Sequence, residues 1–121
     1  MIRLLLLVVT LALGSAVALP AAAQAAERVQ SKSDFVRLVS GKALTRMGIT
    51  LNVSPEGGIA GRAFGQPVTG AWRWQGGLFC RDLRFGSRDL GLNCQVVEKR
   101  GDTIRFIADE GRGDYADLRL R

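Results

Sequence analysis

Residues 68–85 read VTGAWRWQGGLFCRDLRF and show most clearly how this chain folds. From Val68 to Trp74, every second position carries valine, glycine or tryptophan, and polar or small residues lie between them. Side chains two positions apart share one face of a β-strand, so this alternation predicts a strand. Gly76 and Gly77 then permit the positive φ of a tight turn. We therefore predict two antiparallel strands joined at these glycines.

Similar strand patterns, separated by glycine-containing turns, continue on both sides of this hairpin. The further strands that we expect cover 49–53, 59–64, 93–99, 103–108 and 115–121, with turns at 55–58, 100–102 and 110–114. Connections this short join antiparallel neighbours and leave no room for crossover helices. The sequence therefore predicts a mainly β fold, a small antiparallel meander or barrel-like sheet of six or seven strands.

One short helix is expected before the first strand. Ser31 or Ser33 is suited to cap it, residues 34–39 form it, and Gly41 ends it. Its apolar residues recur at helical spacing on one face. Because two helical turns are not stable alone, we expect this helix to pack against the curved sheet or to plug one end of a barrel.

The N-terminal residues have the pattern of an export signal. An apolar run over 4–13 is followed by Pro20 and by small residues, and Ala23 and Ala25 suit the shallow −3 and −1 pockets of signal peptidase. We predict a signal peptide over 1–25 with cleavage at Ala25/Ala26, or as a second choice at Ala26/Glu27. An uncleaved membrane anchor over 4–23 is the alternative.

A linker over 26–31 and a single β-rich domain over 32–121 would follow the signal peptide. The mature protein is then expected in the periplasm or outside the cell, with no transmembrane segment. The 121-residue chain has a formal net charge of +6, and loss of Arg3 with the signal would leave +5. This excess predicts an acidic partner or an anionic component of the cell envelope. Export argues against a nucleic-acid partner.

The composition argues against an enzyme. The chain has no histidine, which is the commonest general base and metal ligand. Two cysteines do not make a structural zinc site by themselves. Residues 57–61 are glycine-rich but match neither dinucleotide-binding nor phosphate-binding loops, so we expect no nucleotide and no cofactor. No catalytic or metal-binding residues are predicted.

Cys80 and Cys94 are the firmest feature of the sequence. Both lie in strand-like segments that flank a loop, and export brings the chain into an oxidising compartment. A redox-active pair usually has close C-x-x-C spacing, which is absent here. We therefore predict a structural disulfide.

Two groups of side chains are candidates for binding. Trp72 and Trp74 lie on one strand face, where they form either part of the core or a platform on which a ligand stacks. Arg81, Arg84 and Arg88 lie between or beside the cysteines, interspersed with acidic residues. They form either a solvated, self-paired loop or a rim that binds anions.

Several motifs resemble those of a group of short exported proteins from alphaproteobacteria. The motifs lie at 44–49, 61–65, 69–74, 79–83, 93–95 and 116–119. The resemblance covers nearly all of the expected mature chain but implies no established activity. Some members carry the label dihydrodipicolinate reductase. The residues here contradict that label, because they include neither the dinucleotide glycine fingerprint nor a histidine.

The leading hypothesis for function is a non-enzymatic periplasmic binding or envelope-accessory module of unknown ligand. The alternative is a small β-barrel inhibitor of an exported hydrolase, with residues 26–33 as an arm that reaches into the cleft of the enzyme.

Overall fold

The computed structural model describes residues 11–16 and 25–121. Most of the predicted signal peptide therefore lies outside the described residues. Residues 11–16 are exposed and form neither helix nor strand. In the part of the chain that is described, no helix has the length and hydrophobicity needed to cross a membrane.

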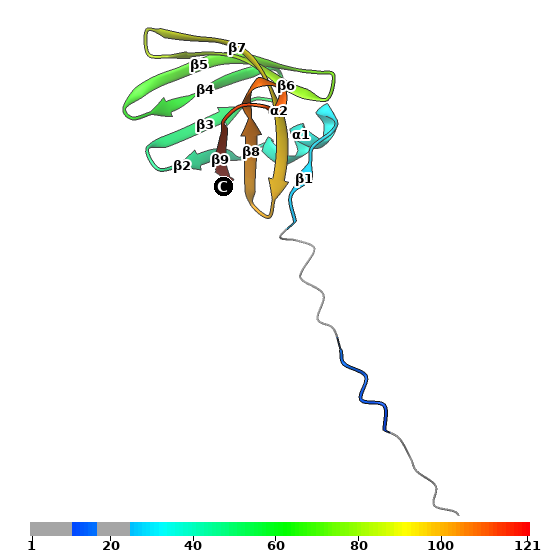
Figure 1. Ribbon diagram of the computed structural model, residues 1–121. Coiled ribbons are helices and arrows are strands. Elements are labelled where there is room, and N and C mark those ends of the chain that lie inside the picture. Colours follow the sequence, from blue (N-terminus) through cyan, green and yellow to red (C-terminus); the bar gives the residue numbers. More distant parts are fainter. Residues whose placement is uncertain (1–10, 17–24) are drawn as a thin grey trace, which may run out of the picture.

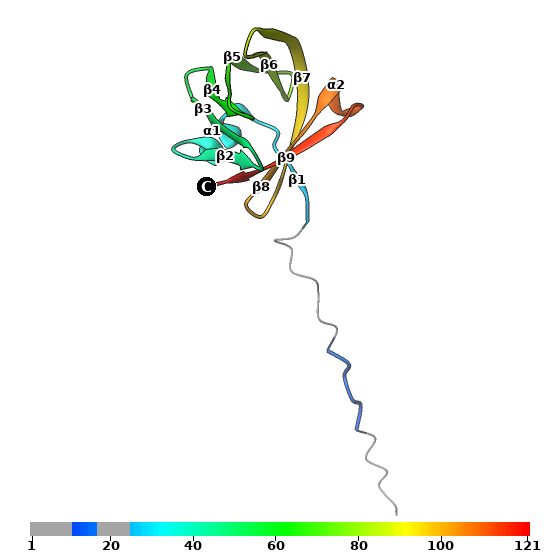
Figure 2. The same cartoon turned by 90° about the vertical axis from the view of Figure 1, so that its left-hand side faces the viewer.

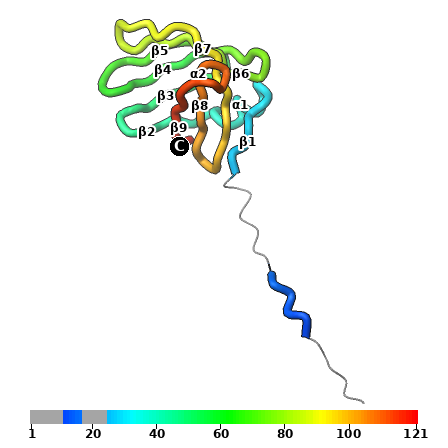
Figure 3. Tube along the Cα trace, viewed as in Figure 1, coloured from blue at the N-terminus to red at the C-terminus, as the bar shows by residue number. Residues whose placement is uncertain are grey.

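The domain is an antiparallel β-barrel that eight strands close (Figures 1, 2 and 3). Its strands are β2 (Ala43–Arg46), β3 (Ile49–Val53), β4 (Gly58–Ala63), β5 (Gln66–Gln75), β6 (Leu78–Phe85), β7 (Arg88–Arg100), β8 (Thr103–Ile107) and β9 (Tyr115–Leu120). Their order around the barrel is β7-β6-β5-β4-β3-β2-β9-β8, and pairing of β8 with β7 closes the ring. The mainly β, antiparallel fold predicted from the sequence is confirmed.

The strand count is higher than the six or seven predicted. One addition is β1 (Glu27–Arg28), which pairs with Lys99 and Glu98 of β7. This pairing corrects the predicted linker over 26–31, since Val29 is also buried and its N–H donates to the carbonyl of Val97. Two charged residues show no alternating pattern, so the sequence does not indicate this strand. The structure places it along the part of β7 that does not pair with β6.

Two glycines let neighbouring strands approach closely on the inside of the barrel. A Cβ atom at Gly61 of β4 would lie 2.1 Å from the carbonyl oxygen of Thr50 on β3. At Gly70 of β5, it would lie 2.2 Å from the carbonyl oxygen of Asp82 on β6. No side chain fits at either distance, so glycine allows the sheet to coil tightly here.

The helix α1 (Lys32–Val39) plugs one end of the barrel (Figure 1), which is one of the two arrangements that the sequence left open, and it begins two residues before the predicted 34–39. Ser31 caps it by accepting a hydrogen bond from the N–H of Asp34 at 3.2 Å. Phe35 and Val39 are almost completely buried and belong to the core. The helix ends at Val39, and Gly41 follows with φ +69°.

The connection between β8 and β9 also differs from the predicted turn at 110–114. It contains the short element α2 (Ala108–Gly111), in which Asp109 and Glu110 adopt left-handed backbone angles. Asn93 of β7 holds this element by a hydrogen bond from its Nδ2 to Asp109 Oδ1 at 2.8 Å. The turn is therefore anchored to the barrel wall and does not project freely into solvent.

Candidate functional site

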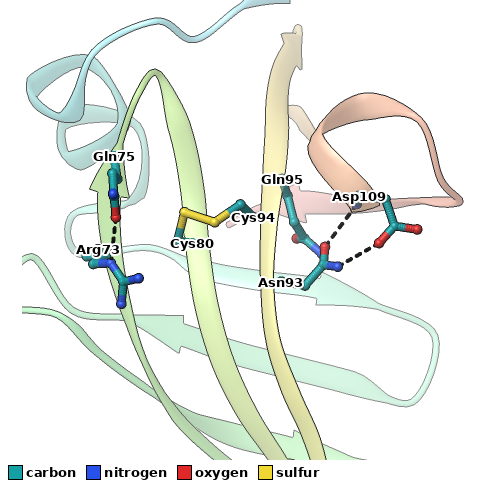
Figure 4. The surroundings of a disulfide bond; sticks show 7 residues. All are labelled: Arg73, Gln75, Cys80, Asn93, Cys94, Gln95 and Asp109. Atoms are coloured by element: carbon teal, nitrogen blue, oxygen red, sulfur yellow. Dashed lines mark hydrogen bonds between the residues drawn. A yellow bond between two sulfur atoms is a disulfide. The ribbon is translucent and has the colours of Figure 1, made fainter.

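The predicted disulfide between Cys80 and Cys94 is present (Figure 4). The two residues face each other across β6 and β7, and Cys80 is almost fully buried. The intervening segment, expected as a loop, consists of strand on both sides of a short turn at 86–87. The bond therefore fastens two paired strands of the barrel wall.

The two tryptophans pack around the plug. Trp72 is 6% exposed and its Nε1 donates a hydrogen bond to the carbonyl of Ser54 at 2.8 Å. Trp74 is half-buried and stacks on the Phe35 ring with centroids 5.3 Å apart. Both indoles thus form part of the contact between the barrel and α1.

Beyond the plug, the barrel encloses a cavity of ≈ 190 Å³, here called the barrel cavity. Its apolar lining consists of Leu44, Leu51, Val53, Ile59, Phe79, Leu83, Phe106, Ala116 and Leu118. Phe79 and Phe106 contact the Phe35 ring, at 5.0 and 6.4 Å between centroids, and so form the floor. Arg81 and Leu83 lie further along β6, toward its turn with β7; both are partly buried and complete the lining on that side. Three hairpin turns, β2–β3, β4–β5 and β6–β7, lie together at the end away from α1 (Figure 1).

Among the residues that the structure describes, two polar side chains line this cavity, Arg81 and Gln95. Arg81 follows Phe79 at strand spacing and is therefore on the inner face of β6. Its Nη1 donates a hydrogen bond to the carbonyl of Gly91 at 2.8 Å. Burial lowers the pKa of Arg81, and the nearby Asp82 carboxylate opposes this effect. The cavity wall thus contains a guanidinium that has lost part of its hydration.

Gln95 joins the cavity to α2 through a short chain of hydrogen bonds. It is 8% exposed and lies opposite Phe79 on β7. Its Nε2 donates to Asn93 Oδ1 at 3.2 Å, and Asn93 in turn bonds to Asp109 (Figure 4). These bonds fix the position of the amide in the cavity wall.

The structure separates the three arginines that the sequence placed together. Arg81 faces the cavity, whereas Arg84 is exposed on the outer face, where it lies 3.8 Å from Asp89 and donates to the carbonyl of Ser87. Arg88 is exposed at the β6–β7 turn. Arg84 and Arg88 thus lie on the outer surface, while Arg81 faces the cavity.

Sequence reasoning missed Gln95 and the inward position of Arg81. The signal was present, because Phe79, Arg81 and Leu83 share one strand face and an arginine interrupts an otherwise apolar row. Gln95 gave no such signal, since its partner on β6 depends on the register of the hairpin.

Comparison of the chain with models of protein families, with curated proteins and with solved structures found no match.

Proposed function

We propose that this protein is a non-enzymatic binding module that takes a small apolar ligand into its barrel cavity. The supporting observation is the cavity itself, whose lining is apolar except for Arg81 and Gln95. Small-molecule sites are typically preformed hollows of this kind, with few polar groups on an apolar wall. An apolar cavity of about 150 Å³ is known to admit benzene, so ≈ 190 Å³ suits a short hydrocarbon group.

The shape of the barrel explains why its own side chains leave this space. The plug fills one end with the Phe35 ring, but α1 ends at Val39 and no second helix of the described chain enters the barrel. On the wall, Ala116 of β9 presents only a methyl group to the cavity. This small side chain leaves part of the space beyond the plug unfilled.

Methyl NMR with octan-1-ol as the probe tests this function. We expect the alcohol to shift the methyl signals of Leu83 and Leu118, which line the cavity, and to leave Val39 in the plug unchanged. Ala116→Phe should abolish these shifts by filling the cavity. Ala60→Phe is the matched control, because Ala60 lies exposed on β4. Absence of cavity shifts at saturating octanol would overturn the proposal.

The location of the protein and its partner stay predictions. We propose that the module acts in the periplasm or outside the cell, and that Arg84 and Arg88 contribute to contact with an acidic partner. Both arginines are exposed, which such a contact requires. Binding of this kind is expected to weaken with salt, since exposed charges are screened within about 10 Å at 0.1 M ionic strength.

The alternative of a hydrolase inhibitor also stays a prediction. Its arm would be residues 26–33, of which Glu27–Arg28 pair with β7 and Ser31 caps α1. The buried Val29 fastens the same segment to the barrel. An inhibitory arm would have to give up these contacts, and we therefore prefer the binding module.

A further inference from the structure

We infer that the ligand of the barrel cavity is an aliphatic monocarboxylate whose carboxylate binds Arg81 and whose hydrocarbon chain extends toward Phe79 and Phe106. This inference rests on the proposed function and names the class of ligand for the same cavity. It follows from the bonding, the environment and the position of one side chain.

Arg81 has hydrogen-bonding capacity that the protein does not use. A guanidinium carries five N–H donors, and only Nη1 of Arg81 has a described partner, the carbonyl of Gly91. Within residues 25–121, five ion pairs form and none includes Arg81. Its neighbour Asp82 lies at the next position on β6 and is exposed on the opposite face of the sheet. The inner wall thus offers a cation that no carboxylate contacts.

The surroundings of Arg81 favour an anion over a neutral group. Burial removes water from its charge, which is costly unless another charge or hydrogen-bonding partner replaces that water. Arginine stays protonated even so, because its ordinary pKa lies far above neutrality. A carboxylate would restore the missing partner by accepting two parallel hydrogen bonds from the planar fork. A single arginine balances one negative charge, so the geometry favours a monoanion.

The position of Arg81 determines the shape of the ligand. The apolar floor formed by Phe79 and Phe106 lies on one side of it, and Leu83, which is nearer the β6–β7 turn, lies on the other. A ligand whose charge sits at Arg81 therefore places its chain on the floor, where burial of apolar surface is favourable. Gln95, diagonal to Arg81 across the β6–β7 pair, adds an amide beside the same carboxylate. A molecule with one charged end and one short apolar chain satisfies all of these groups.

The experiment compares three probes with the same chain, octanoate, octan-1-ol and octylammonium, by isothermal titration calorimetry. We expect the wild-type protein to bind octanoate about tenfold more tightly than octanol, a difference of about 1.4 kcal/mol, because only the carboxylate accepts charge-assisted hydrogen bonds from Arg81. Octylammonium should bind most weakly, because its charge repels Arg81. In Arg81→Gln, the preference for octanoate over octanol should disappear while octanol still binds.

Arg84→Gln is the matched control, because Arg84 is exposed on the outer face of the same strand. It should keep the full preference for octanoate. Arg81→Lys, which retains the charge without the planar fork, should keep only part of it and serves as a second variant if Arg81→Gln does not fold.

The outcomes separate this inference from the proposed function. Equal binding of octanoate and octanol by the wild type would overturn the inference and leave the apolar site in place. Loss of the preference in Arg84→Gln would also overturn it, by moving the anion to the outer face. No binding of any of the three probes would overturn both the inference and the proposed function.

Discussion

The Phe35 ring of α1 meets the Trp72 indole of β5 edge to face, with ring centroids 5.1 Å apart and planes inclined by 71°. The rings of Trp74 and Phe79 lie at similar distances from Phe35. With Phe106 of β8, one residue of a two-turn helix thus contacts aromatic side chains from three strands of the barrel. This relationship closes the barrel at one end and forms the support for the cavity floor.

Phe35→Ala should destabilise the domain by about 3–5 kcal/mol, because it removes a fully buried ring from an aromatic cluster. The measurement is the free energy of unfolding in urea. Arg37→Ala on the exposed face of α1 is the control, and it should cost less than about 1 kcal/mol. If Phe35→Ala lowers the free energy of unfolding by as little as the control does, α1 does not act as a plug.

The sequence predicted the hairpins and the helix because each depends on local pattern. The alternation around Trp72 and the glycines at 76–77 suffice to define β5, its turn and the start of β6. Closure of the barrel could not be predicted in the same way. It depends on the β7–β8 and β2–β9 pairings, and on two charged residues of β1 that fill an open edge. These pairings are set by tertiary contacts, which a single sequence does not display.

Gly61→Ala should lower the free energy of unfolding by about 1–3 kcal/mol, because the new methyl group would collide with the backbone of β3. Gly58→Ala on the same strand is the matched control. Its Cβ would meet only Ser54 side-chain atoms at 3.9 Å, so we expect a change within about 0.5 kcal/mol. If both variants unfold at the same urea concentration as the wild type, the close approach of β3 and β4 is not required for the fold.

Loss of the Cys80–Cys94 bond should lower the melting temperature by on the order of 10–20 °C, since closing a loop of about 15 residues contributes about 3 kcal/mol. The test compares the wild type with a variant that carries both Cys80→Ala and Cys94→Ala, by circular dichroism. A reducing agent should lower the melting temperature of the wild type and leave the variant unchanged. A wild type that is insensitive to verified reduction would show that the bond adds little to stability.

The candidate site was less predictable than the fold. The sequence places Arg81, Arg84 and Arg88 together near the disulfide and makes all three candidates for binding. Of these three, only Arg81 lines the cavity. Strand periodicity distinguishes Arg81 from Arg84 in principle, because they are three residues apart and point to opposite faces. No pattern in the sequence predicts the cavity itself. It arises where Ala116 leaves the space beyond Phe79 unfilled, which depends on how the strands are paired.

Arg105 of β8 and Asp117 of β9 lie opposite each other on neighbouring strands and form an ion pair. Arg105 donates from Nε and Nη2 to the two carboxylate oxygens of Asp117, at 2.8 and 2.9 Å. These hydrogen bonds hold the pKa of Asp117 below its ordinary value, while partial burial acts in the opposite direction. The guanidinium also lies over the Tyr115 ring, 3.7 Å from its centroid, which fixes the fork in place.

A lowered pKa of Asp117 in the folded state makes the stabilisation by this pair depend on pH. Above about pH 4, the ordinary pKa of an aspartate, the carboxylate is charged in both states and the pair stabilises the fold. As the pH falls toward the folded pKa, the unfolded chain takes up the proton first and the stabilisation is lost. The difference in unfolding free energy between the wild type and Asp117→Asn should therefore be constant from pH 5 to pH 7 and shrink at pH 3, as measured by urea unfolding. Asp102→Asn is the control, because Asp102 makes one contact with Arg119, at 3.4 Å between two exposed side chains, and we expect a smaller effect at neutral pH. A difference for Asp117→Asn that is unchanged or larger at pH 3 would show that the two hydrogen bonds do not favour the charged carboxylate.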